Sequence, residues 1–315
     1  MTRISAVVVA WNRRDLLREC LSALAAQTRP LDAIVVVDNA SDDDSAQVAR
    51  EILPDVRLIR LTRNTGGAGG FAVGVAAAVA DTAADLIWIM DDDTVPEPTA
   101  LEELEAARGR LPDDTVVFAS RVVWTEGTDH PMNTPRRHPL ASAARHRRAE
   151  EAGTVLVRSA SFVSLLVDAR AVRDEGLPIA DYFIWNDDFE YTTRLIRGRA
   201  GVYVPSSVVV HKTKALASTD QDPGARFYFE VRNKIWLFRH ARGLTLLEKL
   251  VYGAATLRRW AATRRRTADP AELRDAERRG RRDGWGAPPR ANTDSLADQP
   301  EARELLERFE AERTR

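Results

Sequence analysis

The chain has 315 residues, of which 44% are hydrophobic and 30% charged, and its formal net charge is −1. This composition supports a sizeable buried core and excludes a disordered chain. The balanced charge gives no reason to expect a nucleic-acid partner. The single cysteine, Cys20, excludes an intramolecular disulfide and fits a reducing compartment.

The N-terminus does not have the pattern of a signal peptide. Residues 4–11 are apolar, but polar Asn12 and Arg13 follow where a small-residue cleavage site would be needed. No stretch reaches the length of an uninterrupted apolar membrane span. We therefore expect a cytoplasmic protein, and a peripheral position at the inner face of the plasma membrane stays open.

Strand and helix periodicities alternate through the first 120 residues. Apolar, β-branched runs predict strands at residues 4–11, 33–37, 56–61 and 86–90. Apolar residues at helical spacing predict helices at residues 16–24, 45–53 and 69–84. This order with short links is typical of an α/β fold with a Rossmann-like, mostly parallel sheet and flanking helices.

Polar clusters follow four of these predicted strands. They are Asn12-Arg13, Asp38-Asn39, Arg63-Asn64 and Asp91-Asp92-Asp93. Ligands of such sheets bind beyond the carboxyl ends of the strands. The four clusters together therefore indicate a ligand site more strongly than any one of them.

The second half of the chain is less regular. We expect strands at 116–123 and 202–211, mostly β structure at 155–167, a helix at 187–199, and a long loop or insertion at 126–151. From about residue 225 the chain becomes helical, and ten arginines stand against four acids between 258 and 282. Residues 284–300 look like a linker or disordered segment, and a short charged helix closes the chain at 301–313.

The three aspartates at 91–93 predict a metal site. Adjacent carboxylates repel one another unless a cation neutralises them. Alternate residues of an extended chain point the same way, so Asp91 and Asp93 can face one ligand. Oxygen ligands suit Mg²⁺ or Mn²⁺, which would bridge the phosphates of a nucleotide diphosphate. A solvated acidic turn is the alternative.

Residues 64–71 form a glycine-rich link from a predicted strand to a predicted helix. Glycines let a backbone approach a phosphate or sugar, but the spacing matches neither a P-loop nor GxGxxG. A tight packing turn is therefore the alternative. Asp38 can accept hydrogen bonds from a base or ribose, or it can cap a turn.

Aromatic residues flank a second acidic centre at 182–191. An apolar surround raises carboxylate pKa values and makes the groups usable as bases. An ordinary acidic helix start is the alternative. His211 ends a predicted strand and can complete a metal site, although a lone histidine is more often a packing residue.

Taken together, these motifs resemble family 2 glycosyltransferases of the GT-A fold. The matching segments cover roughly residues 3–240 and are 7–13, 35–41, 64–67, 91–93, 185–191 and His211. Within the family they are most similar to actinobacterial galactofuranosyltransferases, which build cell-wall galactan from UDP-galactofuranose on a lipid-linked acceptor. Two departures stand out: Asn186 separates Trp185 from the Asp pair, and residues 121–160 give no match.

The resemblance implies an inverting, metal-dependent enzyme and assigns its site. Asp188 would be the base, and Asp91, Asp93 and His211 would bind the divalent cation. Acceptor hydroxyls would contact Trp185, Asp187 and Glu190. The nucleotide-sugar would contact Trp11, Arg13, Asp38, Arg63, Asn64, Gly67, Asp91 and Asp92.

The resemblance also implies a domain plan. A GT-A domain would span 1–224, with a nucleotide-sugar half at about 1–120 and an acceptor half at about 121–224. A helical, basic region would follow at 225–283, and a linker with a short helix at 284–315. An amphipathic helix with a basic segment can lie on an anionic membrane, whereas a packed helix with a solvated tail is equally open.

Three other functions are weighed against this one. Rhamnosyltransferases of the same family share most of the motifs and use dTDP-rhamnose. A nucleotidyltransferase would usually carry a basic glycine-rich signature early in the chain, which is absent here. A non-catalytic nucleotide-sugar-binding subunit would be expected to lose the carboxylates, and they are present.

Overall fold

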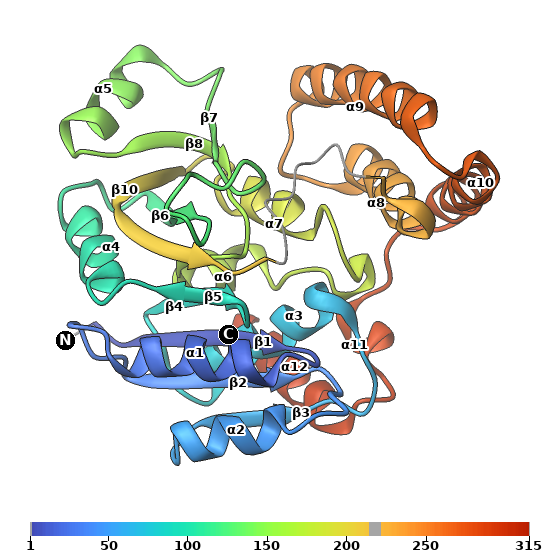
Figure 1. The fold of residues 1–315 in the computed structure, drawn as a ribbon. Coiled ribbons are helices and arrows are strands. Elements are labelled where there is room, and N and C mark those ends of the chain that lie inside the picture. The colour runs from blue at the N-terminus through green and yellow to red at the C-terminus, as the bar shows by residue number, and fades with distance from the viewer. Residues whose placement is uncertain (1, 214–221, 315) are drawn as a thin grey trace.

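A ten-stranded sheet organises the computed structural model, which describes residues 2–213 and 222–314 (Figure 1). The strand order is β3-β2-β1-β4-β9-β6-β10-β8-β7, and β5 pairs with β10 off this path. The strands are β1 Ile4–Ala10, β2 Ala33–Asp38, β3 Arg57–Arg60, β4 Leu86–Asp91, β5 Thr94–Pro96, β6 Thr115–Val123, β7 Arg136–Arg137, β8 Val155–Ser159, β9 Leu165–Asp168 and β10 Ala200–His211.

The two halves of the sheet differ in strand direction. β3, β2, β1 and β4 are all parallel, as predicted for the first 120 residues. β9 is antiparallel to β4 and β6, and β10 is parallel to β6 but antiparallel to β5 and β8. The β5–β10 pairing sets His211 opposite Thr94, so the end of β10 reaches the edge where β1, β2 and β4 end.

Alternate residues of β1 face two separate cores. Val7 and Val9 pack toward one cluster, and Ala6 and Val8 toward the other. Helices α3 (Gly66–Ala80), α6 (Ala169–Glu175) and α7 (Asp187–Leu195) contribute to the first cluster. Helices α1 (Arg14–Ala25), α2 (Ser45–Ile52), α4 (Ala100–Gly109) and α5 (Ala143–Glu151) contribute to the second. Burial on both faces explains the continuous apolar runs in these strands.

Glycines in α3 allow close packing on β1. A Cβ at Gly70 would overlap the Val9 side chain, and one at Gly74 would overlap Val7. A Cβ at Gly67 would meet only the Phe71 ring, at 3.8 Å. Tight packing therefore accounts for Gly70 and Gly74 but not for Gly67.

The expected loop at 126–151 contains more structure than predicted. It holds the short strand β7 and the helix α5, which begins after Ser142, whose hydroxyl accepts a hydrogen bond from the Arg145 backbone N–H. Serine is one of the residues favoured at this position, because its hydroxyl satisfies a free backbone N–H of the first turn.

The C-terminal region is helical, as predicted. Its helices are η2 Gly224–Arg226, α8 Phe227–His240, α9 Leu246–Arg266, α10 Pro270–Gly286, α11 Asn292–Ser295 and α12 Pro300–Arg313. α8 packs against α10, where Gly280 and Gly284 lie directly on the α8 backbone and side chains. Figure 1 shows α8, α9 and α10 together on one side of the sheet, while α12 lies behind its parallel half in this view.

The expectation of disorder at 284–300 is wrong. Trp236 donates to the Ala287 carbonyl at 2.7 Å, and Arg290 pairs with Asp181 at 2.6 Å. The Asn292 side chain accepts from the Ala180 N–H at 2.8 Å. The polar residues that suggested a solvated segment instead bind backbone and side-chain groups of the core.

The closing helix α12 is amphipathic rather than simply charged. Leu305, Leu306 and Phe309 are buried in the same cluster as α3. Just before α12, Gln299 accepts from the Thr62 N–H at 2.7 Å. The end of the chain therefore covers the parallel half of the sheet.

Candidate active site

The acidic triplet lies where β1 and β4 end side by side. Asp92 points toward the segment after β1, where it accepts from the Trp11 N–H at 3.0 Å and from Arg13 Nη1 at 3.3 Å. The same Arg13 nitrogen donates to Asp93. The predicted residues Trp11, Arg13, Asp92 and Asp93 thus form one connected group, in which Asp92 and Asp93 are buried.

Asp91, Asp93 and His211 are brought together as predicted. One ligand atom from each lies within 4.8 Å of the others. His211 Nε2 is 3.1 Å from Asp93 Oδ1, and His211 Nδ1 is 3.0 Å from Asn133 Oδ1. With Nδ1–H donating to Asn133, Nε2 faces the two carboxylates, whose charges raise the pKa of His211. Nε2 therefore pairs with Asp93 when protonated and can bind a cation once deprotonated.

The three aspartates of the triplet differ in the direction in which their pKa values are shifted. Burial and the charge of Asp93 raise the pKa of Asp91 to about 6. Burial raises the pKa of Asp92 to about 7, against the opposing charge of Arg13. Burial acts in the same direction on Asp93, but His211 and Arg13 outweigh it and lower the pKa of that carboxyl group.

These residues fit a divalent cation. Asp93 Oδ1 is buried and accepts no hydrogen bond of good geometry, so a lone pair is left for a ligand. Two carboxylates and an imidazole suit Mg²⁺ or Mn²⁺. A cation would also relieve the repulsion that raises the pKa of Asp91.

The second acidic centre is the start of α7. Asp187 and Asp188 are partly buried in its first turn. Burial raises the pKa of both, and the neighbouring charge of Asp188 raises that of Asp187 further. The charge of Asp188 also raises the pKa of Asp91, so the two acidic centres lie within electrostatic range.

Comparison with known proteins identifies the family. Residues 5–169 match the family described as Glycosyl transferase family 2. The chain belongs to glycosyl transferase family 2. It is therefore a glycosyltransferase, as the motifs predicted.

The similar curated proteins include two galactofuranosyltransferases and a rhamnosyltransferase. The chain is 31% identical to galactofuranosyltransferase GlfT1 of Mycobacterium tuberculosis H37Rv, over 90% of this chain and 97% of that protein. The match to GlfT1 of Mycolicibacterium smegmatis has 33% identity and covers 62% of this chain and 65% of that protein. N-acetylglucosaminyl-diphospho-decaprenol L-rhamnosyltransferase of M. tuberculosis H37Rv is 26% identical, over 70% of this chain and 78% of that protein.

Two solved structures support the GT-A fold. S. aureus TarS 1-349 in complex with UDP has a TM-score of 0.59 at 17% identity, over 99% of this chain and 88% of that one. GalNAc-T7 with UDP, GalNAc and Mn²⁺ has a TM-score of 0.61 at 14% identity, over 95% of this chain and 57% of that one.

In this family member the segment before α7 has an unusual backbone. Phe183, Trp185 and Asn186 all have positive φ, which non-glycine residues rarely adopt. We call residues 183–186 the pre-α7 loop. A Cβ at Gly66 would overlap the Phe183 carbonyl oxygen, and the Ala68 N–H donates to that oxygen at 3.2 Å. The start of α3 therefore supports the loop from one side.

Helix α8 holds the pre-α7 loop from the other side. The buried Asn233 amide donates to the carbonyls of Tyr182, Ile184 and Trp185 at 2.9, 3.0 and 2.8 Å. Asn186 donates to Glu230 of α8 at 2.8 Å. Such bonds compensate for the strain of positive-φ residues and fix where Asp188 lies.

The carboxylate of Glu190, which was predicted to contact the sugar acceptor, is bound by another side chain of the protein. It is buried, and its two carboxylate oxygens bind Arg194 at 2.9 and 2.8 Å. Arg194 also donates to the Leu177 carbonyl at 3.0 Å. In this structure Glu190 therefore anchors α7, and its predicted contact with acceptor hydroxyls gains no geometric support.

The residues predicted to contact the nucleotide lie in two environments. Asp38, at the end of β2, accepts from the Ser41 N–H at 2.9 Å. Asn64 accepts from the Gly66 N–H at 2.7 Å and shapes the start of α3. Arg63 instead pairs with Asp298 at 2.6 Å, so its guanidinium is held by the C-terminal segment.

Sequence reasoning missed Asn133, Asn233 and Lys234. Asn133 lies in the stretch that gave no match, and nothing in its local pattern marks it. Asn233 and Lys234 are buried polar residues of α8. Their signal was three consecutive polar residues, 232–234, in a largely apolar and aromatic helix.

Proposed function

We propose that this enzyme transfers galactofuranose from UDP-galactofuranose, with inversion, to a lipid-linked or polysaccharide acceptor in cell-wall synthesis. The observation that carries the proposal is the Asp91–Asp93–His211 cluster within electrostatic range of Asp188. The 97% coverage of the M. tuberculosis GlfT1 sequence supports the choice of sugar. The UDP in the TarS complex supports a uridine nucleotide.

Asp91, Asp93 and His211 would hold Mn²⁺ or Mg²⁺, and the Mn²⁺ in the GalNAc-T7 structure supports this class of ion. The cation supplies charge that stabilises the departing nucleoside diphosphate. Trp11, whose N–H binds Asp92, is half-exposed, and Gly67 is partly exposed, so both would be accessible to the donor. Asp38 would bind the uracil or ribose from the neighbouring strand end.

Asp188 would act as the general base. Its carboxylate takes the proton of the acceptor hydroxyl as that oxygen bonds to the anomeric carbon. The bond from that carbon to the diphosphate oxygen breaks in the same step. One displacement inverts the anomeric configuration. The raised pKa of Asp188 suits this role, because a stronger base accepts the proton more readily.

The test is nucleotide release from a panel of UDP- and dTDP-sugars, with Mn²⁺, Mg²⁺ or EDTA, using wild type and Asp188→Asn. Metal-dependent release from UDP-galactofuranose that is lost in the variant is the expected result. A product whose anomeric configuration, assigned by NMR, is the same as that of the donor would overturn the role of Asp188. Binding of UDP without turnover in any condition would favour a non-catalytic subunit.

A second candidate is rhamnosyl transfer from dTDP-rhamnose. The 26% identity to the mycobacterial rhamnosyltransferase over 70% of this chain supports including dTDP-rhamnose in the donor panel. Preferential turnover of dTDP-rhamnose would keep the mechanism and replace the sugar.

A further inference from the structure

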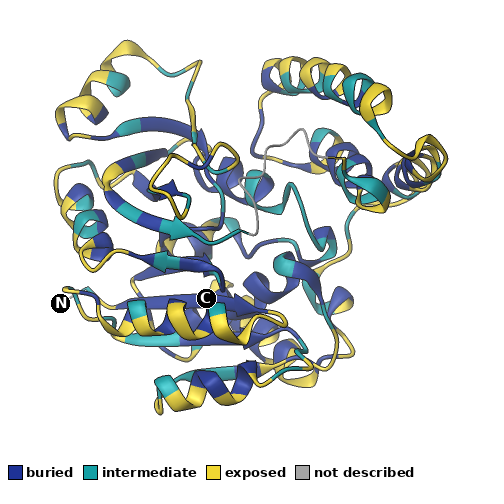
Figure 2. Ribbon diagram, viewed as in Figure 1, coloured by how far each residue is buried: buried dark blue, intermediate teal, exposed yellow. Residues whose placement is uncertain are grey.

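Helix α9 carries its apolar side chains on its solvent side. Leu246, Leu250 and Leu257 are 81%, 72% and 60% exposed. The buried residues of the same helix are Glu248, Thr256 and Trp260, of which two are polar. An ordinary surface helix has the opposite arrangement, with its apolar stripe against the core. Figure 2 shows the exposed residues along α9.

The exposed residues form one continuous face. Helical spacing places 246, 250, 254 and 257 along one line, with 247, 251 and 258 beside it. Arg258 and Arg265 are exposed on the same side toward the end of the helix. We call this set the α9 face, and its members are Leu246, Leu247, Leu250, Val251, Ala254, Leu257, Arg258 and Arg265.

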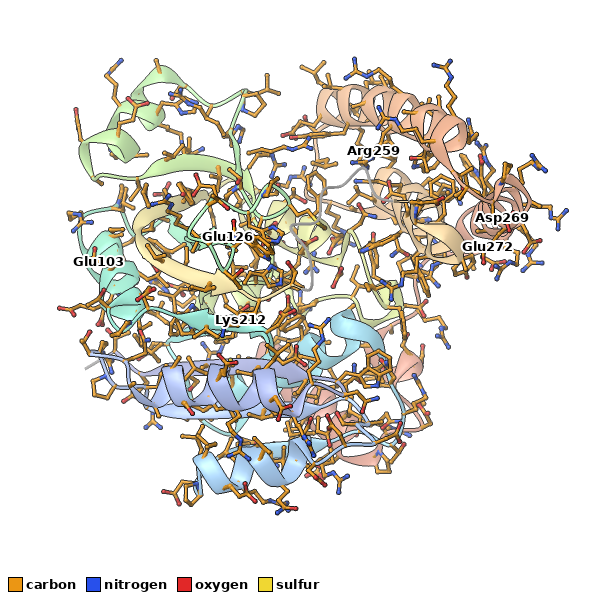
Figure 3. All side chains as sticks on the ribbon, in the orientation of Figure 1. Glu103, Glu126, Lys212, Arg259, Asp269 and Glu272 are labelled. Atoms are coloured by element: carbon orange, nitrogen blue, oxygen red, sulfur yellow. The ribbon has the colours of Figure 1, made fainter. Side chains whose placement is uncertain are left out.

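Specific contacts fix the orientation of α9. Glu248 completes a capping box with Thr245 and binds Arg158 at 2.5 Å, in an ion pair that is buried on both sides. Arg259, labelled in Figure 3, donates to Glu230 of α8 at 2.9 Å. Turning the leucines inward would break these contacts and leave buried charges unpaired. The apolar face is therefore built to point outward.

We propose that the α9 face binds the surface of an anionic lipid bilayer. The leucines would enter the boundary between headgroups and acyl chains, and the arginines would contact lipid phosphates. A second copy of this chain fits the face less well. The single acidic residue of α9 is the buried Glu248, so a symmetric contact would bring the arginines together with no carboxylate of α9 to pair with them.

The inward side of helix α9, opposite the α9 face, lies close to the proposed base. The Tyr252 ring of α9 packs edge-on against Phe189, with ring centroids 5.4 Å apart, and Phe189 follows Asp188 in α7. A bilayer bound to the α9 face would thus lie one helix away from Asp188, and a lipid-linked acceptor would be held in that bilayer. This last step rests on the proposed function, whereas the binding of α9 to lipid does not.

The experiment is flotation with phosphatidylcholine vesicles, with and without phosphatidylglycerol, using the full chain. We expect wild type to bind the anionic vesicles more strongly. Leu246→Ser with Leu250→Ser should lower the partition coefficient by about tenfold or more. Leu140→Ser, at a residue 57% exposed elsewhere, is the control and should change nothing.

Charge is tested separately from apolar contact. Arg258→Gln with Arg265→Gln should lower binding to the anionic vesicles by roughly tenfold and leave weak binding to neutral vesicles unchanged. Arg147→Gln with Arg148→Gln, at exposed positions of α5, removes the same charge elsewhere as a control.

Each outcome decides the proposal. Equal vesicle binding by wild type and both α9 variants would overturn it. A change of oligomeric state in the leucine variant, seen by light scattering with unchanged vesicle binding, would assign the face to a second copy. Donor turnover without vesicles is measured in parallel. If wild type binds the vesicles but turns over no donor, the proposed function is wrong and the lipid-binding proposal stands.

Discussion

The two acidic centres of the site balance their excess charge in different ways. At residues 91–93, burial raises the pKa of Asp91 and Asp92, but Arg13 and His211 lower the pKa of Asp93 and keep it ionised beside a potential cation ligand. At residues 187–188, burial raises both pKa values. The first arrangement suits binding of a cation, and the second suits uptake of a proton. Similar clusters of aspartates thus acquire different chemistry from their neighbours.

The sharpest test of this difference is Asp188→Asn. Removing the base should lower kcat by about 10²–10⁴-fold and leave the affinity for Mn²⁺ unchanged. Steady-state kinetics with isothermal titration of Mn²⁺ measures both. Asp187→Asn is the matched variant and should mainly raise the KM for acceptor. Equal losses of kcat in the two variants would contradict the assignment of the base to Asp188.

Asn233→Ala tests whether the second centre depends on its support. The variant removes three hydrogen bonds to the segment before α7, and a displaced base should cost on the order of 10²-fold in kcat. Metal affinity should stay normal, because the first centre does not contact Asn233. Asn292→Ala is the control, since Asn292 bonds to Pro178 and Ala180, both outside the pre-α7 loop. Its kcat should be nearly unchanged after correction for stability measured by thermal melting.

Asn133→Ala tests the first centre in the same way. Loss of the partner that orients His211 should weaken Mn²⁺ binding by about 10–100-fold. Electron paramagnetic resonance of bound Mn²⁺ measures this without turnover. Ser161→Ala removes the other hydrogen-bond partner of Asn133 and should have a smaller effect. Unchanged Mn²⁺ affinity in Asn133→Ala would refute the orienting role.

The smallest expected effect is a shift in pH dependence. Burial lowers the pKa of Lys234 to about 8, and its positive charge lowers the pKa of Asp188. The base must be ionised to act, so activity falls as pH drops through its pKa. Lys234→Met should raise that pKa and move the acid limb of kcat/KM to higher pH, by about one unit or less. Lys249→Met removes the same charge elsewhere and is the control. A shift of the acid limb to lower pH in Lys234→Met would contradict the predicted effect of Lys234 on the pKa of Asp188.

Local pattern was enough to predict the parallel half of the sheet. The strands at 4–10, 33–38 and 86–91 are buried on both faces, so their sequences are continuously apolar and their ends are easy to locate. The cluster of Asp91, Asp93 and His211 also followed from the strand ends and the family resemblance. His211 reaches the cluster only through the antiparallel pairing of β5 with β10, which no local pattern reveals.

What sequence reasoning missed depends on long-range contacts. The sequence predicted that Glu190 belongs to a cluster of acceptor-binding carboxylates. Arg194 lies one turn away on the same helix and forms an ion pair with the Glu190 carboxylate. Residues 284–300 have the composition of a solvated segment, but their polar groups find partners more than 100 residues earlier in the chain. Composition cannot distinguish a polar group in water from one bonded to a distant carbonyl.

The return of the C-terminal segment to the parallel half has a consequence for protein engineering. Because α12 packs with α3 and Gln299 binds Thr62, the segment that follows α10 is anchored to the parallel half of the molecule. The α8–α10 unit is therefore followed by a fixed segment rather than by a free tail. Chimaeras between relatives should preserve the contacts of that segment. Truncation after α10 would remove α12 and uncover apolar surface on α3, which lies far from the deleted residues in sequence.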